Sequence, residues 1–171
     1  SGVNFKYMFK GADAFNQDLS NWDVSFGKDF YGMFMYAQTF NSNLSNWDVS
    51  SGNNFGGMFE HADKFNQNIN NWDVSSGTNF QWMFYHADLF NKNLGNWDVS
   101  SGINFTAMLS ATPFNKNISS WDVSKGETFQ GMFYKSKKFN KDIGNWDVSS
   151  GTNFSSMFSE AKKFNKDIGN W

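Results

Sequence analysis

The sequence contains no cysteine, no arginine and a single proline. A chain without cysteine has neither a disulfide framework nor a thiolate metal site. Without arginine it also lacks the planar guanidinium group that holds phosphate or carboxylate through two parallel hydrogen bonds. A net charge of −2 gives no dense basic face, so we expect no nucleic-acid partner. No segment approaches the roughly 18 apolar residues of a membrane span, so we expect no membrane insertion by this chain.

Aliphatic residues are also scarce, and aromatic residues take their place. Hydrophobic residues make up only 39% of the chain, whereas aromatic residues reach 20%, with 21 Phe and 8 Trp. The core is therefore expected to consist mainly of rings. Charge is uneven along the chain, because acidic residues outnumber lysines up to residue 114 and lysines outnumber acidic residues after it.

Regularly spaced tryptophans mark a repeat with a period of about 25 residues. The interval between Trp97 and Trp121, near Pro113, is one residue shorter than the others. The repeat units are 1–25, 26–50, 51–75, 76–100, 101–124, 125–149 and 150–171. A fixed period of this length is typical of proteins whose units bury their apolar residues only by stacking on their neighbours. We therefore expect a single repeat domain over residues 1–171, as a segment of a longer protein.

Unit four illustrates the pattern within each unit. Four apolar residues have the spacing i, i+3, i+4 and i+7 of one helical face: Phe80, Met83, Phe84 and Ala87. Candidate N-cap residues precede them: Ser75, Ser76 and Thr78. Residues 94–99 end in an alternation that predicts a short strand, with Trp97 and Val99 pointing inward and Asp98 outward. The predicted fold is a right-handed α/β solenoid of seven repeats, each with a short parallel strand and a short helix.

The repeated motif Phe-Asn-x-x-Ile-x-x-Trp-Asp-Val-Ser, followed by Asn-Phe-x-x-Met-Phe, covers the whole chain. It resembles a bacterial surface-protein repeat, a domain of unknown function that is grouped with BspA-like leucine-rich repeats. The resemblance implies a leucine-rich-repeat-like coil in a cell-surface or extracellular protein, often a lipoprotein or adhesin, without defined catalytic residues. This chain has Gly-x-Asn-Phe, as at 52–55 and 151–154, where that family has Val-Thr-Asn-Met.

One aspartate per unit forms the most suggestive polar row. Its members are Asp23, Asp48, Asp73, Asp98, Asp122 and Asp147. Carboxylates stacked on parallel strands repel one another, and a calcium ion between coils would compensate for that repulsion. Alternatively, each carboxylate accepts hydrogen bonds from the turn that follows it, or the row from Asp48 to Asp147 is a ligand-binding face. No calcium-loop spacing is present, so no cofactor is expected and calcium stays an alternative.

Three further features bear on function. A row of asparagines, one per unit from Asn16 to Asn165, is expected to connect the coils. Trp82 occupies a position that is glycine, alanine or serine in most units, so it is expected to be an exposed contact residue. His61 and His86 share one position in adjacent units and are weak candidates for a metal site.

The inventory of residues does not favour an enzyme, because each candidate group is copied from unit to unit. The first hypothesis is a cell-surface or extracellular module for adhesion to a protein or glycan. The second is a structural element that stacks on itself through uncapped ends, since neither terminal unit has a polar cap.

Overall fold

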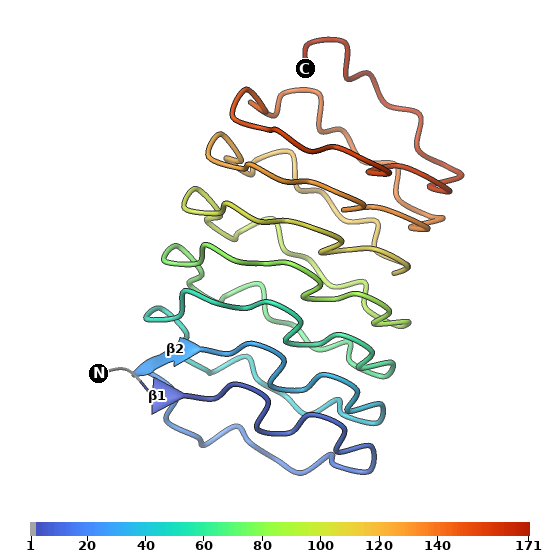
Figure 1. The fold of residues 1–171 in the computed structure, drawn as a ribbon. Helices are drawn as coiled ribbons and strands as arrows, with labels where there is room; N and C mark the ends of the chain where they lie inside the picture. Colours follow the sequence, from blue (N-terminus) through green and yellow to red (C-terminus); the bar gives the residue numbers. More distant parts are fainter. Residues whose placement is uncertain (1–2) are drawn as a thin grey trace.

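The computed structural model describes residues 3–171 as a stack of coils, one for each repeat unit (Figure 1). Two short strands, β1 (Val3–Asn4) and β2 (Gly27–Asp29), pair in parallel across the first two units. Isolated parallel bridges continue this line through every later unit: Asp29–Asn54, Asn54–Asn79, Asn79–Asn104, Asn104–Thr128 and Thr128–Asn153. The coils are therefore in register, and each lies directly against the next.

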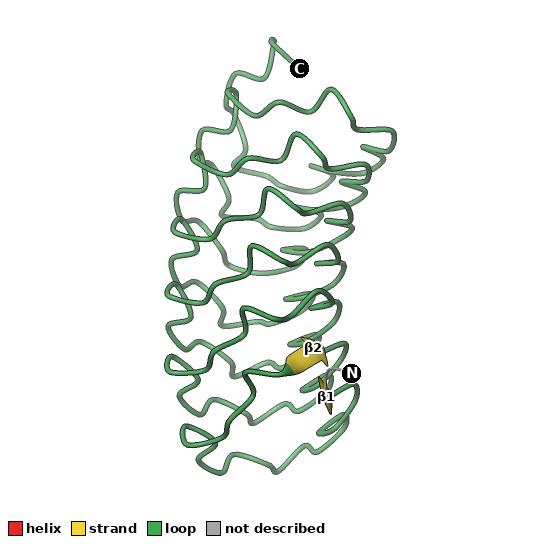
Figure 2. Cartoon of the chain, turned by 90° about the vertical axis from the view of Figure 1, so that its left-hand side faces the viewer, coloured by secondary structure: helices red, strands yellow, loops and turns green. Residues whose placement is uncertain are grey.

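The expected helices are absent from residues 3–171, which form turns and loops outside the two strands (Figure 2). The prediction of an α/β solenoid with a helix in each unit is therefore wrong, as are the N-caps assigned to Ser75, Ser76 and Thr78. In place of the helix, unit four has consecutive tight turns. The amide of Met83 donates to the carbonyl of Phe80, and the amide of Tyr85 donates to that of Trp82, each three residues back.

The remaining amides of this segment explain why no helix forms. Every second N–H points to the next coil and donates to the carbonyl of the residue just before its counterpart in the following unit. In unit four these bonds are Trp82 to Thr106 at 2.8 Å, Phe84 to Met108 at 3.0 Å and His86 to Ser110 at 3.2 Å. A helix would keep all of these donors within its own segment. Here half of them join neighbouring coils.

Left-handed backbone conformations make these turns possible. Two positions per unit have positive φ, and in unit four they are Trp82 (φ 55°) and His86 (φ 54°). Positive φ at the third residue is typical of type II turns, which prefer glycine there. Because the two positions are four residues apart, the turns bury Phe80, Met83, Phe84 and Ala87 at the same spacing as a helix would.

The predicted strand at residues 94–99 is also wrong. Its location contains no strand, and the parallel bridges lie at the position before the first core phenylalanine of a unit, which is Asn79 in unit four, Asp29 in unit two and Thr128 in unit six. The predicted directions of the side chains are nevertheless confirmed. Trp97 and Val99 are buried, whereas Asp98 is exposed.

Parallel rows of aromatic rings fill the interior. In the row from Phe5 to Phe154, neighbouring rings stack with centroids 5.3–5.8 Å apart. The tryptophan row has spacings of 6.2–6.5 Å. Each interior indole also donates its N–H to a leucine or isoleucine carbonyl of the preceding unit, as Trp72 does to Leu44 at 2.9 Å. These bonds satisfy the one polar atom of a buried indole.

The asparagine row connects the coils, as expected. The side-chain oxygen of each member accepts the backbone N–H of its counterpart in the next unit. Asn41 accepts from Asn66 at 2.9 Å, and Asn66 accepts from Asn91 at 3.1 Å. The side of the coil without β-bridges is therefore joined by side chains.

Candidate functional site

One surface of the stack carries the residues that differ most from unit to unit. We call it the turn face, defined by the positions that unit four fills with Gln81, Trp82, Tyr85, His86, Asp88 and Leu89. These side chains are exposed or half-buried, whereas the apolar residues between them are buried. The turn face therefore changes in size and charge along the stack while the core beneath it repeats.

An open groove of about 540 Å³ crosses the turn face of units four to seven. Three aromatic side chains line it: Trp82, Tyr85 and Tyr134. The groove exists because the later units have small residues at the Trp82 position, namely Ala107, Gly131 and Ser156. Its volume is within the range of roughly 300–1,000 Å³ that small-molecule sites have.

Trp82 is the most unusual member of this groove. Its side chain is 37% exposed although it is a large aromatic residue, as predicted from the sequence. Its backbone is left-handed at a position where Gly32, Gly57 and Gly131 stand in other units. A left-handed conformation costs a residue with a side chain roughly 1–2 kcal/mol, and glycine avoids that cost. Trp82 is thus a poor choice for stability alone.

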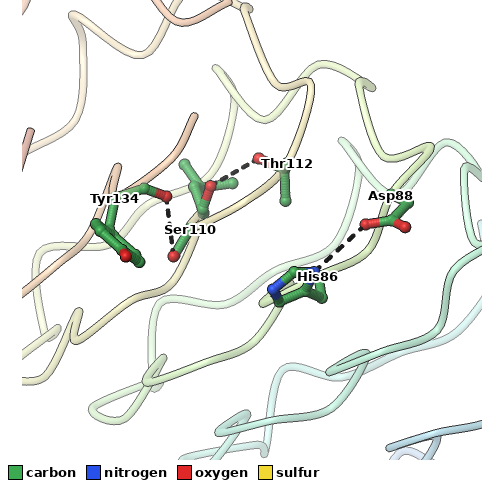
Figure 3. A network of polar contacts seen from close by, with 6 residues as sticks. His86, Asp88, Ser110, Thr112 and Tyr134 are labelled. Atoms are coloured by element: carbon green, nitrogen blue, oxygen red, sulfur yellow. Dashed lines mark hydrogen bonds and ion pairs between the residues drawn. The ribbon is translucent and has the colours of Figure 1, made fainter. Parts of the chain in front are cut away.

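Polar contacts around the shortened fifth unit hold the groove in place (Figure 3). Ser110 Oγ donates to the carbonyl of Tyr134 at 3.0 Å, which fixes one wall of the groove to its floor. Thr112 Oγ1 donates to the carbonyl of Leu109 at 2.7 Å. The hydroxyls therefore secure the coil at the point where it is one residue short.

A second hollow, of about 350 Å³, lies beside the shortened coil. Its lining includes Pro113, His86 and Asp88, with His86 Nδ1 3.6 Å from the Asp88 carboxylate. Three lysines also line it: Lys135, Lys137 and Lys138. The turn face therefore offers an uncharged aromatic groove and, next to it, a basic hollow.

The aspartate row has a local role in the structure. In each case the carboxylate accepts the backbone N–H of the serine two residues later, as Asp98 does from Ser100 at 2.9 Å. In three units the serine hydroxyl is also bonded, at 2.6 Å, as between Ser75 and Asp73. The row from Asp48 to Asp147 is thus engaged in turns, and its proposed role as a ligand-binding face stays a prediction.

Electrostatics do not require a cation along this row. Interaction with the nearby serine hydroxyl, followed by the hydrogen bond from the serine amide, lowers the pKa values of five members: Asp23, Asp48, Asp98, Asp122 and Asp147. Repulsion from a neighbouring aspartate raises the pKa of Asp48, Asp98 and Asp147, but it is a smaller influence. Turn formation alone therefore accounts for the recurring position of the carboxylates within each unit.

These shifts predict a loss of stability in acid. Since the folded pKa lies below the ordinary value of 3.8, the stabilising contribution is complete above that pH and is lost as pH falls through the folded pKa. Replacing Asp48 and Asp98 by asparagine keeps an oxygen acceptor but removes the titration. We expect the double variant to lose less stability than the parent between about pH 5 and pH 2, measured by urea unfolding. Equal losses would contradict this account of the row.

The two histidines lie side by side. Their rings are parallel within 5° with centroids 4.7 Å apart, and the Tyr36 ring stacks on the other side of His61. Burial, followed by the proximity of His86, lowers the pKa of His61 and favours its neutral form. Because the nitrogen lone pairs lie in the planes of parallel rings, those of His61 and His86 do not converge on one point. The stack does not favour a shared metal.

Sequence reasoning identified Trp82 but missed its partners Tyr85 and Tyr134. The two tyrosines occupy one position in units four and six, with Ser110 between them, so a comparison of units at that position was the available signal. Within residues 3–171, no group of three histidine, aspartate or glutamate residues is placed to hold a metal ion. The same residues include no helix of sufficient length and apolarity to cross a membrane.

Comparison with known proteins identifies one family. The family model described as Mycoplasma protein of unknown function, DUF285, matches residues 3–113 and again residues 108–171. Neither a curated protein nor a solved structure matches the chain. The two matches together span all the described residues.

Proposed function

The chain belongs to this DUF285 family, and from that premise we propose that it is a non-catalytic recognition module. In this proposal the coils form a solenoid at the cell surface or in the extracellular space, and its turn face adheres to a protein or glycan. The module acts without a cofactor, binds no nucleic acid and inserts no segment of this chain into a membrane. A closer relationship to BspA-like leucine-rich repeats is part of the same proposal.

The observation that carries the proposal is the contrast between a repeated core and a changing turn face. Repeated residues such as Phe84 and Trp97 are buried and hold coil on coil, whereas the aromatic groove is formed by residues that differ between units. Catalysis requires a distinct set of acid, base or nucleophile. The candidate acids are instead copied along the stack, which favours binding over chemistry.

A binding array tests this proposal. The folded chain is applied to immobilised oligosaccharides and extracellular proteins, and dose-dependent binding to a defined subset is expected. Folding is checked by a cooperative thermal transition of the same preparation. An absence of binding by folded chain would contradict the recognition function.

The array also distinguishes the two candidate surfaces. A variant with Asp73→Ala and Asp98→Ala changes the aspartate row but leaves the turn face intact. Binding through the turn face predicts that this variant keeps its ligands. Loss of binding without loss of folding would place the ligand on the aspartate row instead.

The alternative function is self-assembly of copies end to end. Aromatic rings of the terminal coils, such as Phe9 and Phe158, are partly buried and continue the interior rows. Rings of another copy would extend those rows. Sedimentation velocity over a range of concentrations tests this alternative, which predicts growing oligomers and is contradicted by a constant monomer.

A further inference from the structure

The groove bordered by Trp82, Tyr85 and Tyr134 has the chemistry of a site for sugars. We propose that it binds a neutral oligosaccharide chain, an inference that rests on the recognition function proposed above and names the class of ligand. Four features of the groove support this inference: its aromatic surfaces, its polar groups, its lack of charged lining residues and the hydrogen bonding of its backbone.

The aromatic side chains provide flat surfaces for a pyranose ring. One face of many pyranoses presents C–H groups with partial positive charge, which pack against the electron-rich face of an indole or phenol. Trp82 is exposed, and Tyr85 and Tyr134 are half-buried on two units with Ser110 between them. The Tyr85 ring is held edge-on by the rings of His61 and His86, at 5.5 and 4.7 Å. Such preorganised surfaces bind with little loss of side-chain freedom.

The polar groups of the groove match hydroxyl-rich ligands. They are the hydroxyls of Thr106, Ser156 and Ser159 and the amide of Gln130, all of which reach the groove surface. Thr106 Oγ1 already pairs with Thr128 Oγ1, and Gln130 Oε1 accepts from Asn153 Nδ2. The hydroxyls of Ser156 and Ser159 and the amide nitrogen of Gln130 are therefore the groups best suited to pair with sugar hydroxyls. No lining residue of the groove has a charged side chain, and Lys135, whose Nζ lies 4.9 Å from the centroid of the Tyr134 ring, is not among the lining residues. The lining itself therefore offers no charge to compensate for a carboxylate, sulfate or ammonium group.

The backbone of the groove argues against a peptide that adds as an extra strand. That mode of binding needs free main-chain donors and acceptors at an edge. The amides along this groove are already used between coils: Trp82 donates to Thr106, Ala107 to Gln130 and Gly131 to Ser155, at 2.8–2.9 Å. These amides of units four to six are therefore not available to pair with an added strand.

The backbone of Trp82 has the left-handed conformation that every unit has at this position. Three other units fill its position with glycine, which suits the left-handed conformation, and Tyr7, Ala107 and Ser156 hold the same conformation in the remaining units. Trp82 is the residue at this position that brings a large exposed ring to the groove. Trp82 is therefore the residue on which the test concentrates.

The test is titration of the folded chain with cellohexaose, mannohexaose, maltohexaose and chitohexaose by calorimetry. Trp82→Gly introduces the residue that the neighbouring unit has at this position, and we expect it to fold with an unchanged or higher Tm. Its affinity for the best of these sugars should fall by about tenfold or more.

Tyr7→Gly is the matched control. Tyr7 occupies the same position in unit one, with φ 59° against 55° for Trp82, and it lies outside the groove. The control should keep its affinity for the sugar within about twofold. Equal losses in both variants, or an affinity of Trp82→Gly within about twofold of the parent, would overturn the inference.

Other ligands separate this inference from the proposed function. Binding of sulfated oligosaccharides or peptides without any binding of the neutral sugars would overturn the sugar site but leave the recognition function intact. Failure of the folded chain to bind anything on the array would overturn both. Retained sugar binding by Trp82→Gly, together with loss in the Asp73→Ala and Asp98→Ala variant, would move the site to the aspartate row.

Discussion

Replacing Phe59 by alanine is expected to lower the free energy of unfolding by about 3–5 kcal/mol, the range for large-to-small changes of a buried ring. Phe59 is fully buried and stacks between Phe34 and Phe84, with centroids 5.7 Å from each. It also contacts the Phe65 ring at 3.8 Å within its own unit. The substitution therefore leaves a cavity at two coil interfaces at once. Denaturant unfolding monitored by tryptophan fluorescence measures the loss.

Phe26→Ala provides the matched control. It makes the same chemical change in the same chain, but Phe26 is 70% exposed. Surface substitutions of this kind usually change stability by less than about 0.5 kcal/mol. A similar loss in both variants would mean that the aromatic rows do not hold the stack together.

Replacing Asn66 by alanine is the second change with a large expected effect. Its side-chain oxygen accepts the backbone N–H of Asn91 at 3.1 Å, on the side of the coil that has no β-bridges. Without that oxygen, the Asn91 amide loses its partner in a half-buried location. We expect a loss of about 1–3 kcal/mol in the free energy of unfolding, measured by the same denaturant titration.

Asn71→Ala controls for the residue type within the same unit. Asn71 lies outside the asparagine row, directly before Trp72, and is exposed to solvent. Its replacement should change stability by less than about 0.5 kcal/mol. If Asn66→Ala were equally mild, water would be replacing the missing acceptor, and the asparagine row would not be needed to join the coils.

The repeat and the composition of its core could be predicted from the sequence alone. The period of the tryptophans defines the units, and the residues expected inside, such as Phe80, Phe84 and Trp97, are buried. Such residues are large and apolar in nearly every unit, so their location follows from chemistry and period. The connecting role of the asparagine row was also predictable, because an asparagine recurs at the same position in every unit.

The path of the backbone could not be predicted in this way. A helix and these tight turns bury residues at the same spacing here, because the two left-handed positions of each unit are four residues apart. The helix and the turns differ in the acceptor of the Trp82 amide, which here is the carbonyl of Thr106 in the next coil. That partner belongs to the following repeat unit, beyond the reach of a local periodicity argument.

The groove could not be predicted from the sequence either. Trp82 was recognisable because it replaces small residues at one position. Tyr85 and Tyr134 join it in one groove only when units four to seven are stacked. The missing residue near Pro113 was visible in the sequence. Its consequence, a hollow beside Lys135 and Lys137, depends on the hydrogen bonds that hold the shortened coil.

The central claim is that the core builds the stack while the turn face binds. A variant with Trp82→Gly, Tyr85→Ser and Tyr134→Ser tests it, because other units already have these residues at the same positions, as Gly57, Ser110 and Ser159. The measurement is array binding of this variant beside the parent, with Tm recorded on the same samples. The account predicts a Tm within a few degrees of the parent and loss of its ligands. Unchanged binding by the folded variant would contradict the account.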